Sequence, residues 1–136
     1  MEKEEDLKGL ASQLMVRCEE KLAAAKLLLN NDKFDDSISR SYYAAFLASR
    51  ALLLLLGSTP KSHGRMITMM SLKAIKQGIL SAEVGKKLGD LMEARQTSDY
   101  AFFSHYEKED AEKYLESAIS IINAIKDVLK EKFDIA

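Results

Sequence analysis

The sequence is poor in residues that break helices or cross-link chains. Its 136 residues include one proline, six glycines, one cysteine and no tryptophan. A lone cysteine, Cys18, excludes an intramolecular disulfide and a zinc cluster held by several thiolates. With 30% charged and 47% hydrophobic residues, the composition is typical of an ordered, helical protein. One compact domain covering residues 1–136 is the expected organisation.

The chain also lacks an excess of charge of one sign and a long apolar run. The formal net charge is -1, so no overall positive field draws the protein to nucleic acid, and any such contact has to be local. The most apolar stretch, residues 41–60, contains Arg50 at its middle, and we therefore expect no membrane insertion. The acidic N-terminal segment MEKEEDLKGL lacks the features of a signal peptide, so we expect a cytoplasmic protein.

Familiar enzyme signatures are missing from the sequence. It has no glycine-rich phosphate loop, no G-x-S-x-G turn and no H-E-x-x-H pair. His63 and His105 are the only histidines, and their spacing to carboxylates identifies no metal site. Cys18 lies on an apolar helix face, where a buried inert thiol is expected. We therefore expect neither a metal nor a cofactor.

The densest apolar stretch, from Asp35 to Gly57, predicts a long helix buried at the centre of a bundle. Asp35 or Asp36 is the expected N-cap, and Gly57 the expected C-terminal stop. One side of this helix carries residues that step by four and three, namely Ile38, Tyr42, Ala45, Ser49, Leu52 and Leu56. Other sides carry apolar residues as well, which is typical of a helix surrounded by neighbours.

Four more helices are predicted around this one. Their expected ranges are 4–30, 66–78, 81–97 and about 104–132, and the last begins with the capping box S-x-x-E at Ser104 to Glu107. The first is expected to bury Leu7, Leu10, Leu14, Cys18, Leu22, Ala25 and Leu29, and the third to bury Met66, Ile67, Met69, Met70, Leu72 and Ile75. Gly85 and Gly89, four apart on one face, either weaken the helix at 81–97 or let another helix approach closely. The fold class is therefore all-α, an up-and-down bundle of about five helices.

Arginines near polar or aromatic groups are the main candidates for a site. Arg95 lies four residues before Asp99 and five before Tyr100, so it either pairs structurally with Asp99 or contacts a phosphate through its planar fork. Arg40 and Arg50 leave the same alternatives open, because an arginine on so apolar a helix needs a partner or must reach solvent. His63 is either a helix cap, a surface group or a functional residue.

Four motifs in order resemble the HEPN superfamily, in particular its small stand-alone archaeal and bacterial members. They are S-R-S-Y-Y-A-A-F at 39–46, the apolar run to Gly57, S-H-G at 62–64 and R-x-x-S-D-Y at 95–100. The resemblance implies a helical bundle that dimerises and binds nucleotide or RNA. It further implies a toxin-antitoxin pair with a minimal nucleotidyltransferase, and in many members metal-independent RNase activity.

RNase members of that superfamily carry a histidine four to six residues after the arginine, and this sequence departs from the pattern. After Arg95, four intervening residues lead to Tyr100, six lead to Phe102 and nine lead to His105. A tyrosine with a pKa near 10 is a poor general base at neutral pH. The R-x-x-x-D-Y variant is common in this branch of the superfamily.

Three functional hypotheses follow. The first is a homodimer that binds nucleotide or RNA through Arg40, Tyr43, His63, Arg95 and Asp99 and acts with a minimal nucleotidyltransferase. The second is a metal-independent RNase in which Arg95 stabilises the phosphorane and Tyr100 or His105 does acid-base work. The third is a scaffold without ligand. Aromatic residues in 100–106 and an excess of apolar helix faces predict the homodimer.

Overall fold

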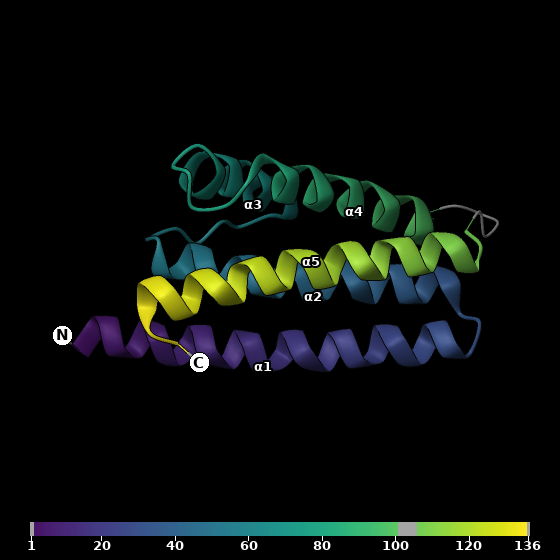
Figure 1. Cartoon of the computed structure of the whole chain (residues 1–136), viewed down its shortest axis with the longest axis horizontal. Helices are drawn as coiled ribbons and strands as arrows, with labels where there is room; N and C mark the ends of the chain where they lie inside the picture. Colours follow the sequence, from purple (N-terminus) through teal and green to yellow (C-terminus); the bar gives the residue numbers. More distant parts are fainter. Residues whose placement is uncertain (1, 101–105, 136) are drawn as a thin grey trace.

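The computed structural model describes residues 2–100 and 106–135, and these residues form a helical bundle without strands (Figure 1). The five α-helices are α1 (Glu2–Asn30), α2 (Phe34–Leu55), α3 (His63–Met70), α4 (Ala82–Tyr100) and α5 (Lys108–Phe133). A π-helical turn, η1 (Ser71–Ile75), follows α3 directly. The predicted all-α bundle of about five helices is confirmed.

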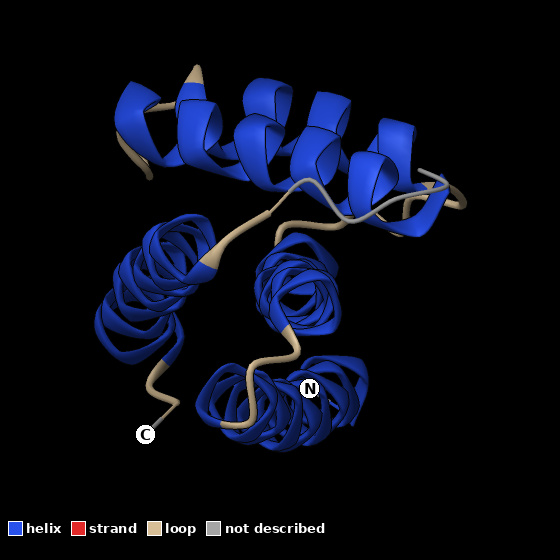
Figure 2. Cartoon of the chain, turned by 90° about the vertical axis from the view of Figure 1, so that its right-hand side faces the viewer, coloured by secondary structure: helices blue, strands red, loops and turns tan. Residues whose placement is uncertain are grey.

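Helix α2 is the centre of the bundle. It contacts each of the other four α-helices. Helices α1, α2 and α5 run alongside one another and are seen nearly end-on in Figure 2, while α3 and α4 lie across α2 and α5 at an angle. The predicted central helix is therefore confirmed, with neighbours on most sides, while Asp36, Arg40 and Arg50 remain exposed.

Burial along α2 follows the predicted stripe. Ile38, Tyr42, Ala45, Ser49 and Leu52 are fully buried. Each large aliphatic side chain among them contributes about 1.5–3 kcal/mol on burial, so this stripe is a main source of stability. The hydroxyl of Ser37 donates a 2.7 Å hydrogen bond to the carbonyl of Ala25, which joins the buried faces of α2 and α1 through a satisfied polar contact.

The two ends of α2 test the predicted caps. The N-cap is Lys33 and not Asp35 or Asp36. The two aspartates lie instead in the first turn, where their negative charge interacts favourably with the positive end of the helix dipole. Gly57 does end the helix, with φ of 84°. The Ser58 amide donates to the Leu53 carbonyl at 2.8 Å, closing the glycine-containing C-terminal motif that the sequence predicts.

Two predicted core leucines are exposed. Leu10 of α1 is 49% exposed, because the buried face instead runs through Ala11, Cys18, Leu22 and Ala25. Leu72 is 41% exposed because the buried face runs through Met66, Met70 and Ala74, and Leu72 lies midway between the last two, on the opposite side. The third helix is thus α3 followed by a π turn, and it begins at His63 rather than at Met66.

The last helix begins later than its capping signal predicted. Ser104 lies outside the described residues, and the N-cap is Glu107. The Glu107 amide donates a 2.9 Å hydrogen bond to the carboxylate of Asp110, the third residue of the helix. The capping box is therefore formed by Glu107 and Asp110, and not by Ser104 and Glu107 as predicted. The predicted buried stripe of α5, from Ala111 to Leu129, is confirmed.

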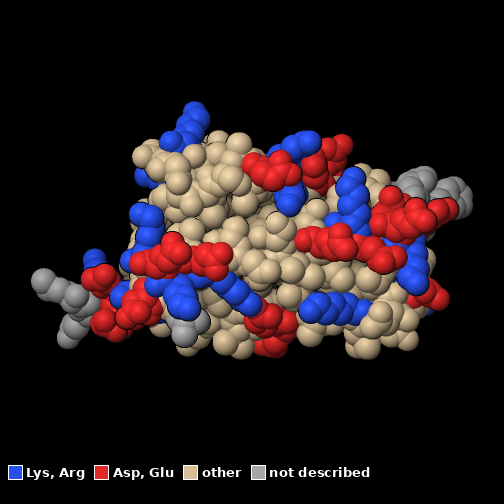
Figure 3. Space-filling model, viewed as in Figure 1, with Lys and Arg blue, Asp and Glu red and all other residues tan. Residues whose placement is uncertain are grey.

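Charged side chains of both signs are interspersed over the face seen in Figure 3. This mixture agrees with the near-zero net charge of the sequence. Within residues 2–100 and 106–135, no helix combines the length and the apolar character needed to cross a membrane.

Candidate functional site

The first turns of α2 and the last turns of α4 form a depression of about 380 Å³. Its lining residues come from α1, α2 and α4 and are Leu28, Asp36, Ser39, Arg40, Tyr43, Arg95 and Asp99. The four residues from α2 share one face, because they are spaced by three and four along the helix. Four residues predicted for a ligand site therefore face one depression: Arg40, Tyr43, Arg95 and Asp99.

Arg95 is held firmly in this depression. Its Nη2 donates a 3.0 Å hydrogen bond to the phenol oxygen of Tyr43, and its Nε lies 2.8 Å from Oδ2 of Asp99. The guanidinium carbon lies 5.1 Å from the ring centroid of Tyr43 and 5.6 Å from that of Tyr42. With its side chain 16% exposed, Arg95 is fixed by two aromatic faces and one carboxylate.

Asp99 joins α4 to α2. Its Oδ2 pairs with Arg95, and its Oδ1 accepts a 3.1 Å hydrogen bond from the hydroxyl of Ser39. The predicted pairing of Arg95 with Asp99 is confirmed as a contact. Tyr100 is the last residue of α4, and its side chain lies outside the described residues.

The other two arginines of α2 reach solvent. Arg40 is exposed at the rim of the depression, one turn after Asp36. Arg50 is exposed further along α2, with its guanidinium carbon 5.9 Å from the ring centroid of Phe46. The sequence required each of these arginines either to have a partner or to reach solvent, and both side chains reach solvent.

His63 lies outside the lining of the depression and within an aromatic cluster. Its ring stacks on Phe46 at 4.4 Å between centroids, and the phenol of Tyr42 and Nδ1 of His63 share a hydrogen bond of 2.7 Å. The ring of His63 also meets the ring of Tyr43 edge-on at 6.0 Å between centroids, so Tyr43 contacts both His63 and Arg95. The cap of α3 is Ser62, whose hydroxyl accepts from the Arg65 amide, so His63 is not the cap.

Burial and Arg95 set the ionisation of this cluster. Burial lowers the pKa of His63, and the nearby positive charge of Arg95 lowers it further. Burial raises the pKa of Tyr42 to about 12, although Arg95 opposes that rise. At neutral pH both groups are therefore uncharged, and Arg95 and Asp99 carry the charge beside them.

Ser39, Asp36 and Tyr42 are site residues that the sequence analysis did not select. Ser39 bonds Asp99, Asp36 lines the depression, and Tyr42 connects Arg95 to His63. Helical spacing from the candidate Arg40 places Asp36 one turn earlier, and this signal identifies the face. Nothing in the local spacing links Ser39 to Asp99, which are 60 residues apart.

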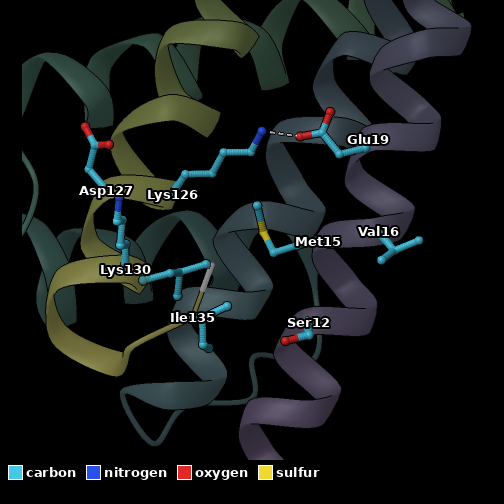
Figure 4. A pocket seen from close by; sticks show the side chains of 9 residues that line it. Ser12, Met15, Val16, Glu19, Lys126, Asp127, Lys130 and Ile135 are labelled. Atoms are coloured by element: carbon cyan, nitrogen blue, oxygen red, sulfur yellow. Dashed lines mark ion pairs between the residues drawn. The ribbon is translucent and has the colours of Figure 1, made fainter.

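A larger cavity, of about 520 Å³, lies elsewhere, between α1 and α5 (Figure 4). Met15, Val16 and Ile135 give it aliphatic walls, and an ion pair between Lys126 and Glu19 spans the two helices. It contains none of the predicted site residues. No three His, Cys, Asp or Glu side chains in the described part of the chain are grouped to hold a metal ion.

Comparison with known proteins identifies the family. The model of the HEPN domain matches residues 11–128. The chain belongs to the HEPN family. The resemblance inferred from the four motifs is thus confirmed, and the match includes the whole depression around Arg95.

Relatives of this HEPN chain are found in archaea and bacteria. It is 32% identical over 126 residues to "Putative toxin MJ0605" of Methanocaldococcus jannaschii, covering 93% of each chain. It is 30% identical over 115 residues to a "UPF0332 protein" of Thermotoga maritima, covering 85% of this chain and 87% of that one. It is 46% identical over 70 residues to "UPF0332 protein PH1297" of Pyrococcus horikoshii, covering 52% of this chain and 49% of that one.

Proposed function

We propose that this HEPN protein is the toxin-type member of a toxin-antitoxin pair and that it binds a nucleotide or RNA phosphate in the depression around Arg95. The name of the relative from Methanocaldococcus jannaschii supports the toxin type. The partner proposed from the motif pattern is a minimal nucleotidyltransferase. The proposed assembly is a homodimer.

The observation that carries the proposal is the placement of two arginines from different helices at one depression with a tyrosine. Arg95 from α4 and Arg40 from α2 line it together with Tyr43. Its volume of about 380 Å³ lies within the range of sites that hold small ligands. Arginine forks match the geometry of phosphate oxygens, so this pair suits a phosphate ester.

Arg95 keeps donors available for such a ligand. A guanidinium has five N–H donors. Nη2 of Arg95 donates one N–H to Tyr43, and Nε lies at ion-pair distance from Asp99 without a hydrogen bond. The two N–H groups of Nη1 and the second of Nη2 are not used by these two contacts and can serve a ligand. Because Tyr43 and Asp99 already orient the fork, little side-chain entropy is lost when a phosphate binds.

Asp36 and Asp99 balance the charge of the two arginines that line the depression. A phosphate therefore competes with Asp99 for Arg95, and its binding should weaken as salt screens the arginines. Arg40, exposed at the rim, is the group that a phosphate meets first.

Fluorescence anisotropy with a labelled adenine nucleotide and a labelled single-stranded RNA tests this site. Arg95→Ala is expected to weaken binding by about 10-fold or more, because it removes a charge-assisted phosphate contact. Lys86→Ala, which removes an exposed charge of α4 away from the depression, is the matched control and should bind as the wild type does. Equal affinity of the Arg95→Ala and wild-type proteins would contradict the proposal.

Incubation with total RNA separates binding from catalysis. His63, the one histidine in the described part of the chain, bonds Tyr42 and does not line the depression, which favours binding without efficient cleavage. RNA cleavage by the wild type that is lost in Arg95→Ala would instead assign the RNase function to Arg95, with Tyr100 or His105 in acid-base work. If the protein bound no nucleotide, no RNA and no nucleotidyltransferase, the third hypothesis, a scaffold without ligand, would remain.

Light scattering tests the proposed homodimer. The excess of apolar helix faces carries this part of the proposal, and Val16 and Leu72 are large hydrophobic side chains that remain exposed on the single chain. Tyr106, one of the aromatics from which the homodimer was predicted, is half-buried, with its ring centroid 5.9 Å from that of Tyr114. Residues 101–105 lie outside the described part. A monomer at micromolar concentration would contradict the homodimer.

A further inference from the structure

Three adjoining depressions, each sharing lining residues with the next, follow one another along the surface. They lie at the end of the bundle where α2 ends near the N-terminal part of α1 (Figure 1). The first, of about 280 Å³, lies between Leu10, Leu14 and Arg17 of α1 and Arg50 and Leu54 of α2. The second shares Leu14, Arg50 and Leu54 with it and reaches the loop 58–60. The third, of about 340 Å³, shares that loop and extends to Lys61, Arg65 and Met69.

We call the three depressions together the basic groove, because their charged lining is entirely cationic. Arg17, Arg50, Lys61 and Arg65 line it and are all exposed. No described carboxylate lines any of the three depressions. In a chain with 20 basic and 21 acidic residues, four cations together are a local concentration of charge that favours an acidic ligand.

The floor of the basic groove is aliphatic. Leu10, which is 49% exposed, Leu14 and Leu54 line its α1–α2 part, and Met69 lines the far end. Leu10, Leu14 and Arg17 share one face of α1, since they are spaced by four and three residues. A ligand in this groove therefore meets a row of leucines flanked by arginines and lysine.

The combination of aliphatic floor and cationic rim discriminates between two classes of acidic ligand. Single-stranded nucleic acid gains much of its affinity from bases stacked on aromatic rings, and no aromatic residue lines the basic groove among the described residues. An amphipathic helix places apolar side chains at intervals of three and four residues into a groove and carries its charges along the rim. The lining of the basic groove therefore fits an acidic amphipathic helix better than it fits single-stranded nucleic acid.

We propose that the basic groove binds an acidic amphipathic helix of a partner protein. Leucine-type side chains of that helix pack on Leu10, Leu14 and Leu54, and its carboxylates pair with Arg17 and Arg50 on one side and with Lys61 and Arg65 beyond the loop. Arg50 is already oriented by its contact with the ring of Phe46.

This site is independent of the depression around Arg95. The two have no lining residue in common, and they lie toward opposite ends of α2, with Asp36 to Tyr43 at one and Arg50 to Leu54 at the other. The proposal therefore goes beyond the nucleotide or RNA function and can fail or succeed separately from it.

The test uses a fluorescein-labelled synthetic peptide helix with leucines along one face and glutamates on both sides of them. Fluorescence anisotropy should show saturable binding to the full chain. The double variant Arg17→Glu/Arg50→Glu should weaken it about 10-fold or more through charge reversal at the rim. Leu10→Ser should also weaken it, because it removes an exposed apolar contact.

Matched controls test whether the effect depends on this groove, on the charge of the peptide and on correct folding. Arg95→Ala should bind the peptide as the wild type does, and a peptide with lysine in place of every glutamate should not bind. Unchanged far-ultraviolet circular dichroism and melting temperature should show that the double variant folds. Equal binding of both peptides, or undiminished binding by the folded double variant, overturns the proposal.

Two further outcomes would also overturn it. One is no anisotropy change at peptide concentrations up to about 100 μM, which is weaker than a specific helix-in-groove contact. The other is binding of a labelled 12-nucleotide RNA that the same double variant abolishes while the acidic peptide does not bind. That result would assign the basic groove to nucleic acid.

Discussion

Arg95 is held by groups that are distant in sequence and close in space. Tyr43 accepts its hydrogen bond from 52 residues away, and Asp99 pairs with it from the next turn of α4. Removing the arginine side chain leaves the Asp99 carboxylate with its contact to Ser39 only, among the contacts described here. At this scale a single substitution therefore changes both the charge and the hydrogen bonding of the depression.

His63 gives the pH dependence of stability at the residue scale. Its folded-state pKa lies below the ordinary value of about 6.5, so the unfolded chain binds a proton at a pH where the folded chain does not. The contribution of His63 to the free energy of unfolding is therefore fully present above the unfolded-state pKa of about 6.5. It is lost as the pH falls from there through the folded-state pKa.

Urea unfolding at about pH 7.5 and pH 5.5 measures this effect. The wild type is expected to lose more stability than His63→Gln between the two values, because glutamine does not titrate. His105 is present in both proteins and cancels in the comparison. An identical loss of stability in the two proteins would show that His63 titrates as it does in the unfolded chain.

Glycines of the helices and of the turn after η1 differ in whether their backbone and surroundings tolerate a side chain. Gly78 follows the π turn with φ of 76°, and the Ile79 amide donates to the Ala74 carbonyl at 2.9 Å across it. Gly85 lies inside α4, where an added Cβ would come within 3.4 Å of the Ile75 side chain. Gly89, one turn later, would meet nothing within 4 Å. A Cβ at Gly85 would therefore be in ordinary contact with Ile75, and the open space at Gly89 fits a glycine that only weakens the helix.

Two glycine substitutions should change stability in opposite directions. Gly78→Ala is expected to destabilise the protein by about 1 kcal/mol, because an alanine is strained at positive φ. Gly89→Ala should stabilise it by up to about 1 kcal/mol, since alanine favours a helix interior and the site has room. Thermal unfolding followed by circular dichroism measures both, and two changes of the same sign would contradict this account.

At the scale of the whole molecule, stability depends on α2. This helix contacts α1, α3, α4 and α5, and most of its buried apolar residues belong to the main core cluster, while Ile38 belongs to a smaller one with Ala94 and Ala111. Outer helices bury one side only, as the exposed Val16 and Leu27 of α1 illustrate. A cavity made in α2 is therefore adjacent to several helices at once.

Leu52→Ala should lower the free energy of unfolding by about 2–5 kcal/mol, because Leu52 is fully buried and its loss leaves a cavity. Leu27→Ala makes the same chemical change on the outer face of α1, where the side chain is 64% exposed, and should change stability by no more than about 0.5 kcal/mol. Urea unfolding measures both. Similar losses for the two variants would contradict the central position of α2.

The sequence alone determined the helices and the family. Periodicity placed the apolar faces, Gly57 marked the end of α2, and four motifs in order identified the HEPN family. These features are local, because helix propensity, capping and periodicity act within a few residues. The pairing of Arg95 with Asp99 is local for the same reason.

Only the tertiary structure decided which helix faces meet. The hydrogen bond of Ser39 to Asp99 and the contact of His63 with Tyr42 depend on how α4 and α3 cross α2. The basic groove likewise combines α1, α2, a loop and α3. Crossing angles result from side-chain packing between helices, and local periodicity does not specify them.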